Sequence, residues 1–309
     1  MSKNLFVGVD GKARKTKEFY VGVNGKAHRI VKAYIGDENG KARLFWDNES
    51  NIAENSLEFV SDNSFTMNTT KLWDGTLTYN NGNGWTIWDG SQISSGNISG
   101  RQRIYFRGSN NTYIMGTNGS GSNGWKITGS TVECNGNIEC LLDYQKVAAG
   151  EHPEMGSRCY IYMFYGCSSL TTAPELPATT LAQYCYSNMF NNCSSLIIAP
   201  ALPATTLAVS CYRGMFYGCF RLRKIPALPA HILPDYCYYG MFKECDIYLY
   251  SSGDETKNVI YLLPSEKNQW TNTKKESNSL TDMFTYDGLI QTPNFPAGYR
   301  LDNYYSIIS

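Results

Sequence analysis

Hydrophobic positions in the second half of the chain recur every 26 residues. Each copy opens with Met-Phe-x-x-Cys, and the four openings begin at Met163, Met189, Met215 and Met241. In the first three copies a Leu, a Pro and then Leu-Pro-Ala follow at fixed distances. Self-similarity at such a period is typical of a solenoid, in which each unit buries its apolar face only against its neighbours.

The spacing inside one copy predicts a strand, a turn and a helix. Four apolar side chains around the second opening lie four residues apart, namely Leu181, Cys185, Met189 and Cys193. That spacing places them along one side of an α-helix. The β-prone runs 170–173 and 196–199 are each stopped by a Pro and predict short strands. Each copy is therefore expected to hold a short strand, a Pro-bounded turn and a helix of about three turns.

The cysteines follow the same register. Eight of the ten fall in two phases of the repeat, at Cys159, Cys185, Cys211, Cys237 and at Cys167, Cys193, Cys219, Cys245. Within one predicted helix the two phases are about 12 Å apart, which is too far for a disulfide. Zinc favours close pairs such as Cys-x-x-Cys, which do not occur. We therefore predict free, buried thiols with no metal and no cofactor. Cys134 and Cys140 lie outside the repeat, and a disulfide between them is left as an alternative.

The repeat unit resembles that of a known protein family. The unit Met-Phe-x-x-Cys-Ser-Ser-Leu-Thr-Thr-Ala-Pro-Glu-Leu-Pro-Ala, over about Cys159 to Cys245, resembles the BspA-type leucine-rich-repeat family. That family occurs in bacterial surface proteins and in fibre or attachment proteins of tailed bacteriophages. The resemblance implies adhesion or assembly without a shared active site. Residues 282–297 resemble one more degenerate copy and are expected to form a cap.

A shorter repeat occupies the N-terminus. Val-Gly-Val-Asp-Gly-Lys-Ala-Arg at 7–14 returns at 21–28 and, one residue longer, at 35–43. Asp-Gly and Asn-Gly between β-prone runs are strong signals for tight hairpins, so residues 5–46 predict three hairpins in a meander. So small a sheet has little core of its own and is expected to pack on another chain, in a homo-oligomer or a larger assembly. The unit also resembles repeats near the ends of phage structural proteins.

The N-terminal repeat is basic, with ten Lys and Arg against four Asp and Glu, whereas the whole chain balances 27 against 27. A solvated hairpin surface would explain this, as would a basic face that docks on an acidic protein. Nucleic acid is a weaker candidate because a basic helix and interleaved aromatics are absent. The candidate docking residues are Lys12, Arg14, Lys26, Arg29, Lys41 and Arg43.

Between the two repeats, residues 51–149 alternate β-prone runs with Gly, Asn and Ser turns. The runs are 57–60, 76–79, 85–88, 103–107, 113–115 and 125–127. Runs at this spacing predict an antiparallel sandwich or barrel. Its aromatic residues Trp85, Trp88, Trp125 and Tyr113 are either a sugar-stacking platform or sandwich core. Because Trp85 and Trp88 are three residues apart, a regular strand would point them to opposite faces.

Motifs that carry chemistry are scarce. The three histidines, His28, His152 and His231, stand in no triad pattern, and neither a phosphate-binding loop nor His-Glu-x-x-His occurs. A glycosidase needs only two carboxylates at the right separation, which a sequence does not reveal. No apolar run approaches the roughly 18 residues of a membrane span, and no apolar segment of a signal peptide follows Met1.

These observations lead to one expectation about architecture and function. The fold is expected to be mainly β, with hairpins at 1–46, an antiparallel β-sandwich at 47–150 and an α/β solenoid of leucine-rich-repeat-like coils at 151–309. The expected function is that of a non-enzymatic structural protein in the virion of a tailed bacteriophage. It would contact other virion proteins through its hairpins and present a surface to a host glycan or protein. A bacterial surface adhesin is the alternative, and a glycan-cleaving enzyme is the third hypothesis.

Overall fold

The computed structural model describes residues 53–116, 118–222, 226–230 and 232–245. It also describes the strands of the N-terminal repeat and short pieces at 274–275, 278–279, 281–283, 300–301 and 307–308. The chain divides into two compact units, Met1–Glu54 and Asn55–Ser309.

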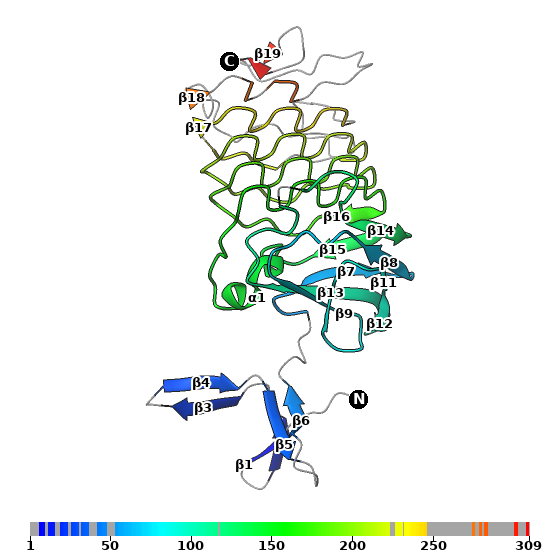
Figure 1. The fold of residues 1–309 in the computed structure, drawn as a ribbon, viewed down its shortest axis with the longest axis vertical. Helices are drawn as coiled ribbons and strands as arrows, with labels where there is room; N and C mark the ends of the chain where they lie inside the picture. Colours follow the sequence, from blue (N-terminus) through cyan, green and yellow to red (C-terminus); the bar gives the residue numbers. More distant parts are fainter. Residues whose placement is uncertain are drawn as a thin grey trace. The chain divides into compact units, whose positions relative to one another are not determined.

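The first unit contains the three predicted hairpins, each antiparallel (Figure 1). They pair β1 (Phe6–Val9) with β2 (Lys12–Lys15), β3 (Phe19–Val23) with β4 (Lys26–Ile30), and β5 (Lys32–Gly36) with β6 (Ala42–Asp47). The register joins Val9 to Lys12 and Val23 to Lys26, as a two-residue connection requires. The prediction of a continuous meander was wrong, because the described strands form three separate two-stranded sheets.

The second unit begins with two β-sheets. The larger has seven strands in the order β10-β9-β13-β7-β15-β16, with β12 also pairing with β13. They are β7 (Leu57–Ser61), β9 (Thr76–Asn80), β10 (Thr86–Ile87), β12 (Gly96–Ile98), β13 (Arg101–Ser109), β15 (Val132–Asn135) and β16 (Leu170–Thr172). The smaller sheet runs β11 (Ile93–Ser94), β8 (Phe65–Asn68) and β14 (Lys126–Gly129).

The sheets are mixed in direction and form no closed barrel among the described residues. All their neighbours are antiparallel except β15 and β16, which run parallel. This β-rich arrangement agrees with a sandwich of two sheets. The run 113–115, predicted as a strand, contains none. The single helix of the described part, α1 (Cys140–Ala148), packs against β13 and precedes the repeats.

The core of the two sheets continues into the first repeat. Trp125 lies 5.0 Å from both Trp88 and Phe106, measured between ring centroids. Phe164, in the opening of the first repeat, lies 6.2 Å from Trp125 and 6.0 Å from Phe59. One buried cluster therefore spans the β-sheets and the repeats.

The helix predicted in each repeat is absent from the described residues, and a run of turns stands in its place. Every fourth residue of the run has a positive φ, as at Tyr184 (57°), Asn188 (53°) and Asn192 (60°) in the second repeat. The third repeat places Gly at two of these positions, Gly214 (57°) and Gly218 (69°). A residue with positive φ ends an α-helix, so the four-residue apolar spacing comes from successive turns.

Backbone hydrogen bonds alternate between neighbouring residues of these turns. Within the first repeat, the N–H of Met163 donates to the carbonyl of Tyr160 at 3.2 Å. The N–H of Phe164 instead donates across to Met189 of the second repeat at 2.9 Å, and Phe190 donates likewise to Met215. Each turn segment is therefore bonded to the next at a constant offset, and the repeats stack (Figure 1).

Side chains stack in register with this backbone. The rings of Tyr160, Tyr186, Tyr212 and Tyr238 form one column, and those of Phe164, Phe190, Phe216 and Phe242 form a second. Neighbouring centroids in the two columns are 5.5–5.8 Å apart. The thiols of Cys193 and Cys219 donate to the carbonyls of Phe164 and Phe190 in the preceding repeat, both at 3.1 Å. The thiols therefore fill the interior and also bond one repeat to another.

All ten cysteines lie in the described part, are buried and form no disulfide, Cys134 and Cys140 included. Burial raises the pKa of Cys167, Cys211 and Cys219 to about 12. Since the thiolate is the reactive form, we expect native protein at about pH 8 to leave these thiols unlabelled by a disulfide reagent. The same reagent should count ten free thiols after denaturation without reductant. A count of two would instead indicate four disulfides in the repeats.

No helix of the described residues has the length and apolar character that a membrane crossing requires.

Candidate functional site

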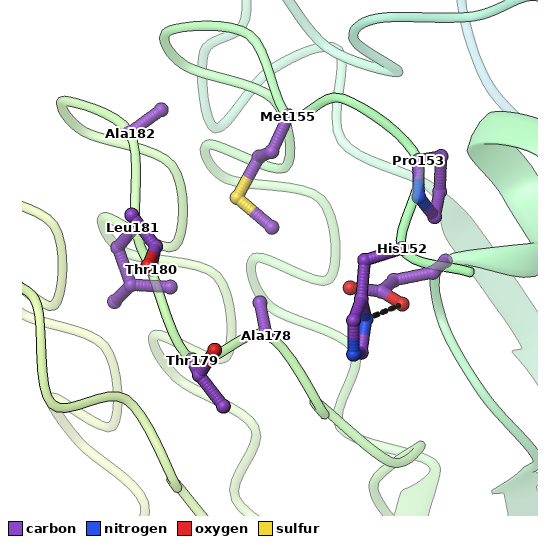
Figure 2. A pocket seen from close by; sticks show the side chains of 9 residues that line it. His152, Pro153, Met155, Ala178, Thr179, Thr180, Leu181 and Ala182 are labelled. Atoms are coloured by element: carbon purple, nitrogen blue, oxygen red, sulfur yellow. Dashed lines mark hydrogen bonds and ion pairs between the residues drawn. The ribbon is translucent and has the colours of Figure 1, made fainter. Parts of the chain in front are cut away.

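A pocket of about 360 Å³ opens where the chain enters the repeats. Its lining is mostly apolar but includes a carboxyl, an imidazole and two hydroxyls, from Glu139, His152, Pro153, Met155, Ala178, Thr179, Thr180, Leu181 and Ala182. Figure 2 shows Met155 extending between the 178–182 segment and His152. The residues come from the N-terminus of α1, the connection after it, and the first repeat.

Glu139 and His152 form the polar end of this pocket. Nδ1 of His152 and Oε2 of Glu139 are 2.8 Å apart (Figure 2), and Glu139 is only 2% exposed whereas the His152 side chain is 60% exposed. Glu139 is the N-cap residue of α1, and its N–H donates to Oδ1 of Asn137 at 2.8 Å. Burial raises the pKa of Glu139, and its contact with His152 opposes that shift.

The Glu139–His152 pair places polar groups at one end of the pocket. The carboxylate can accept a hydrogen bond from a hydroxyl or hold a cation. Among the described residues, the hydrogen-bond partner of the His152 side chain is Glu139. The sequence showed His152 as an isolated histidine. Its partner lies thirteen residues earlier, across α1, and no local motif marks the pair.

Because burial raises the pKa of Glu139, the stability of the fold depends on pH in a predictable direction. A carboxyl whose pKa lies above its ordinary value of 4.5 binds its proton more tightly in the folded state, so its contribution to stability falls as pH rises above that value. We expect Glu139→Gln to increase stability relative to the wild type by more at about pH 7 than at about pH 4. Urea unfolding at both pH values measures this, with exposed Glu151→Gln as the control. A stability gain of Glu139→Gln over the wild type that is smaller at about pH 7 than at about pH 4 would contradict a raised pKa of Glu139.

The four aromatic residues, for which the sequence left a sugar-stacking platform and sandwich core as alternatives, do not form a platform together. Trp88 and Trp125 are 1% and 0% exposed and contact each other in the core, so they are unavailable for stacking. Trp85 is partly exposed and lies under the guanidinium of Arg107, 4.4 Å from the ring centroid. Tyr113 is half-buried. Two of the four residues therefore belong to the sandwich core, the alternative interpretation of this group.

The candidate docking residues fall mostly within the described hairpin strands. Lys12 and Arg14 lie in β2, Lys26 and Arg29 in β4, and Arg43 in β6. Lys41 lies outside the described residues. Their role in docking stays a prediction.

A second candidate surface is the outward side of the turn segments. Six partly exposed tyrosines lie there, Tyr162, Tyr165, Tyr184, Tyr217, Tyr236 and Tyr239, together with Arg158 and Arg213. We call these eight residues the outer wall. The residues between them in the sequence, such as Tyr160, Met163 and Phe164, are fully buried. The wall therefore consists of the outward members of segments whose inward members form the core.

The aromatic and cationic groups of the outer wall contact one another. The guanidinium of Arg158 lies 4.7 Å from the ring centroid of Tyr184. That of Arg213 lies 5.1 Å from the ring of Tyr239 and 5.5 Å from the ring of Tyr236. These pairs join adjacent repeats and hold flat side chains at the surface.

Comparison of the chain with protein-family models, curated proteins and solved structures finds no match. Within the described residues, no group of three or more His, Cys, Asp and Glu is placed to hold a metal ion.

Proposed function

We propose that the protein is a non-enzymatic structural component of a tailed-bacteriophage virion. Its N-terminal hairpins attach it to the particle, and its repeats form a leucine-rich-repeat-like solenoid that presents a recognition surface. The observation that carries this proposal is the contrast between constant buried positions and varied outward positions in the stacked repeats.

The contrast is clear when equivalent positions are compared. The inward positions keep Cys, Tyr, Met and Phe in all four repeats, and these side chains are at most 4% exposed. At outward positions the residue changes from Arg158 to Tyr184 and Tyr236, and from Gln183 to Val209 and Asp235. A frame that stays constant while its surface varies supports binding, since outward residues can change without disturbing the core.

The pocket supports binding in preference to glycoside cleavage. Enzymes that cleave glycosidic bonds use two carboxyl groups on either side of the scissile bond in most families. The pocket lining contains one carboxyl, Glu139, and its partner is an imidazole. A single carboxyl paired with an imidazole favours a non-enzymatic role.

A protein inventory of purified phage particles tests the proposal. We expect this chain to be recovered at a fixed copy number that survives high-salt washing of the particles. Recovery from bacterial cell envelopes in the absence of phage particles would overturn the proposal and favour an adhesin. Hydrolysis of surface polysaccharide that is lost in Glu139→Gln would overturn the non-enzymatic assignment.

A further inference from the structure

The outer wall has the composition of a surface built for recognition. Tyrosine and arginine are the residues most enriched where interfaces gain their binding energy, and Asn, Ser and Gly supply adaptable hydrogen bonds. The wall combines six tyrosines and two arginines with Asn188 and Asn192, which are partly exposed in the same turn segments. These residues are supported from behind by rigid columns of stacked rings.

Among the described residues, exposed aliphatic groups are scarce on the outward side of the turn segments, where Val209, 36% exposed, lies beside Tyr184 of the wall. The large hydrophobic side chains that are most exposed in the described residues are Ile87, Ile198, Val209, Phe220 and Ile232, none of which belongs to the wall. Ile161, which shares a turn segment with Tyr162, is only 4% exposed. A protein partner would usually bury an apolar centre. Flat rings with hydroxyls and amides beside them instead suit a ligand that has both C–H faces and many hydroxyl groups.

The charges of the wall favour an anionic ligand. Arg158 and Arg213 form no ion pair with any described residue. Two carboxyls of the last repeats have other partners: Glu244 accepts a hydrogen bond from Tyr217 at 2.5 Å, and Asp282 lies 3.9 Å from Nζ of Lys243. Each guanidinium is held flat against tyrosine and keeps donors for a carboxylate or a phosphate.

The wall contains two cation–π clusters, Arg158 with Tyr184 and Arg213 with Tyr236 and Tyr239. The two arginines occupy different positions of the 26-residue repeat, so the clusters are two separate subsites. A polymer that contacts both subsites has a higher overall affinity than one subsite provides.

We propose that the outer wall binds an acidic polysaccharide, with tyrosine rings stacked on sugar faces and Arg158 and Arg213 paired with its anionic groups. This inference rests on the proposed function, because it assigns the host-directed surface to this wall and its ligand to bacterial surface glycans of acidic composition.

The test measures binding of the full chain to purified bacterial capsular polysaccharides bearing carboxylate groups, to polysaccharides bearing phosphate, and to neutral ones. Two double variants remove the wall's chemistry: Arg158→Gln with Arg213→Gln, and Tyr184→Asn with Tyr236→Asn. Asn is chosen at Tyr184 and Tyr236 because both have positive φ, which Asn tolerates. Matched controls are Lys146→Gln, which removes an exposed charge on α1, and Ile232→Asn, which removes an exposed apolar side chain.

We expect binding to one or more acidic polysaccharides, weakening at least tenfold in each wall variant and unchanged in both controls. Binding should also weaken as salt is raised, because charge pairs contribute. The inference would be overturned if no acidic polysaccharide bound, or if neutral polysaccharides bound equally well. It would also be overturned if the wall variants bound normally, or if the wall captured a purified host surface protein. The protein inventory of phage particles tests the proposed function separately from glycan binding. If the chain bound acidic glycans through its wall but were absent from virions, only the virion assignment would be refuted.

Discussion

Phe190→Ala is expected to lower the free energy of unfolding by about 3–5 kcal/mol. Phe190 is fully buried and lies between two other rings of its column, 5.5 Å from Phe164 and 5.6 Å from Phe216. Its removal leaves a cavity that the neighbours cannot close, because both are fixed by backbone hydrogen bonds between repeats. Because Phe190 contacts a ring on either side, its loss weakens two of the contacts that hold this column together.

Urea unfolding of the full chain, followed by circular dichroism, measures this effect through the midpoint and the slope. Phe220→Ala is the matched control, because the same ring is removed from a side chain that is 47% exposed. That variant should change stability by about 0.5 kcal/mol or less, as surface substitutions usually do. Equal losses in the two variants would contradict the assignment of Phe190 to a continuous column.

The stacking of the repeats could be predicted from the sequence, but the local structure inside each one could not. Apolar residues at every fourth position fit both a helix and successive four-residue turns. The distinguishing signal is the Asn or Gly at Asn188, Asn192, Gly214 and Gly218, residue types that tolerate positive φ. That signal is weak by itself because Tyr184 and Tyr236 also adopt positive φ. Their turns are stabilised by hydrogen bonds to the next repeat, which no single repeat reveals.

The hairpins were predictable because their signal is local: Asp-Gly or Asn-Gly between β-prone runs determines the pairing without reference to the rest of the chain. The short strands β11 and β12 carry too few residues for an alternating pattern. The Glu139–His152 pair depends on how α1 leads into the repeats, and the outer wall on which side of each turn faces outward. Such tertiary placement is not encoded in a local spacing.

Deleting residues 1–46 is expected to abolish incorporation of the protein into phage particles while leaving the remainder folded. The described core runs from Leu57 to Met283, so the deletion removes none of its residues. The three hairpins lie in a separate compact unit, Met1–Glu54, and each forms only a two-stranded sheet. Isolated two-stranded hairpins are marginally stable in water, so we expect them to gain stability by packing on a partner in the particle. Circular dichroism checks the fold of the truncated chain, and quantitative immunoblotting of purified particles checks its incorporation.

A charge variant separates the contribution of basic side chains from that of the hairpin backbone. Replacing Lys12, Arg14, Lys26, Arg29, Lys41 and Arg43 by Gln removes six positive charges and keeps the Asp-Gly and Asn-Gly connections on which the hairpins depend. If docking is electrostatic, this variant should incorporate poorly, and incorporation of the wild-type chain should fall when particles are assembled at high salt. Normal incorporation of the charge variant with loss in the deletion would assign docking to strand or apolar contacts of the hairpins. Normal incorporation of the deletion itself would show that attachment to the particle resides elsewhere in the chain.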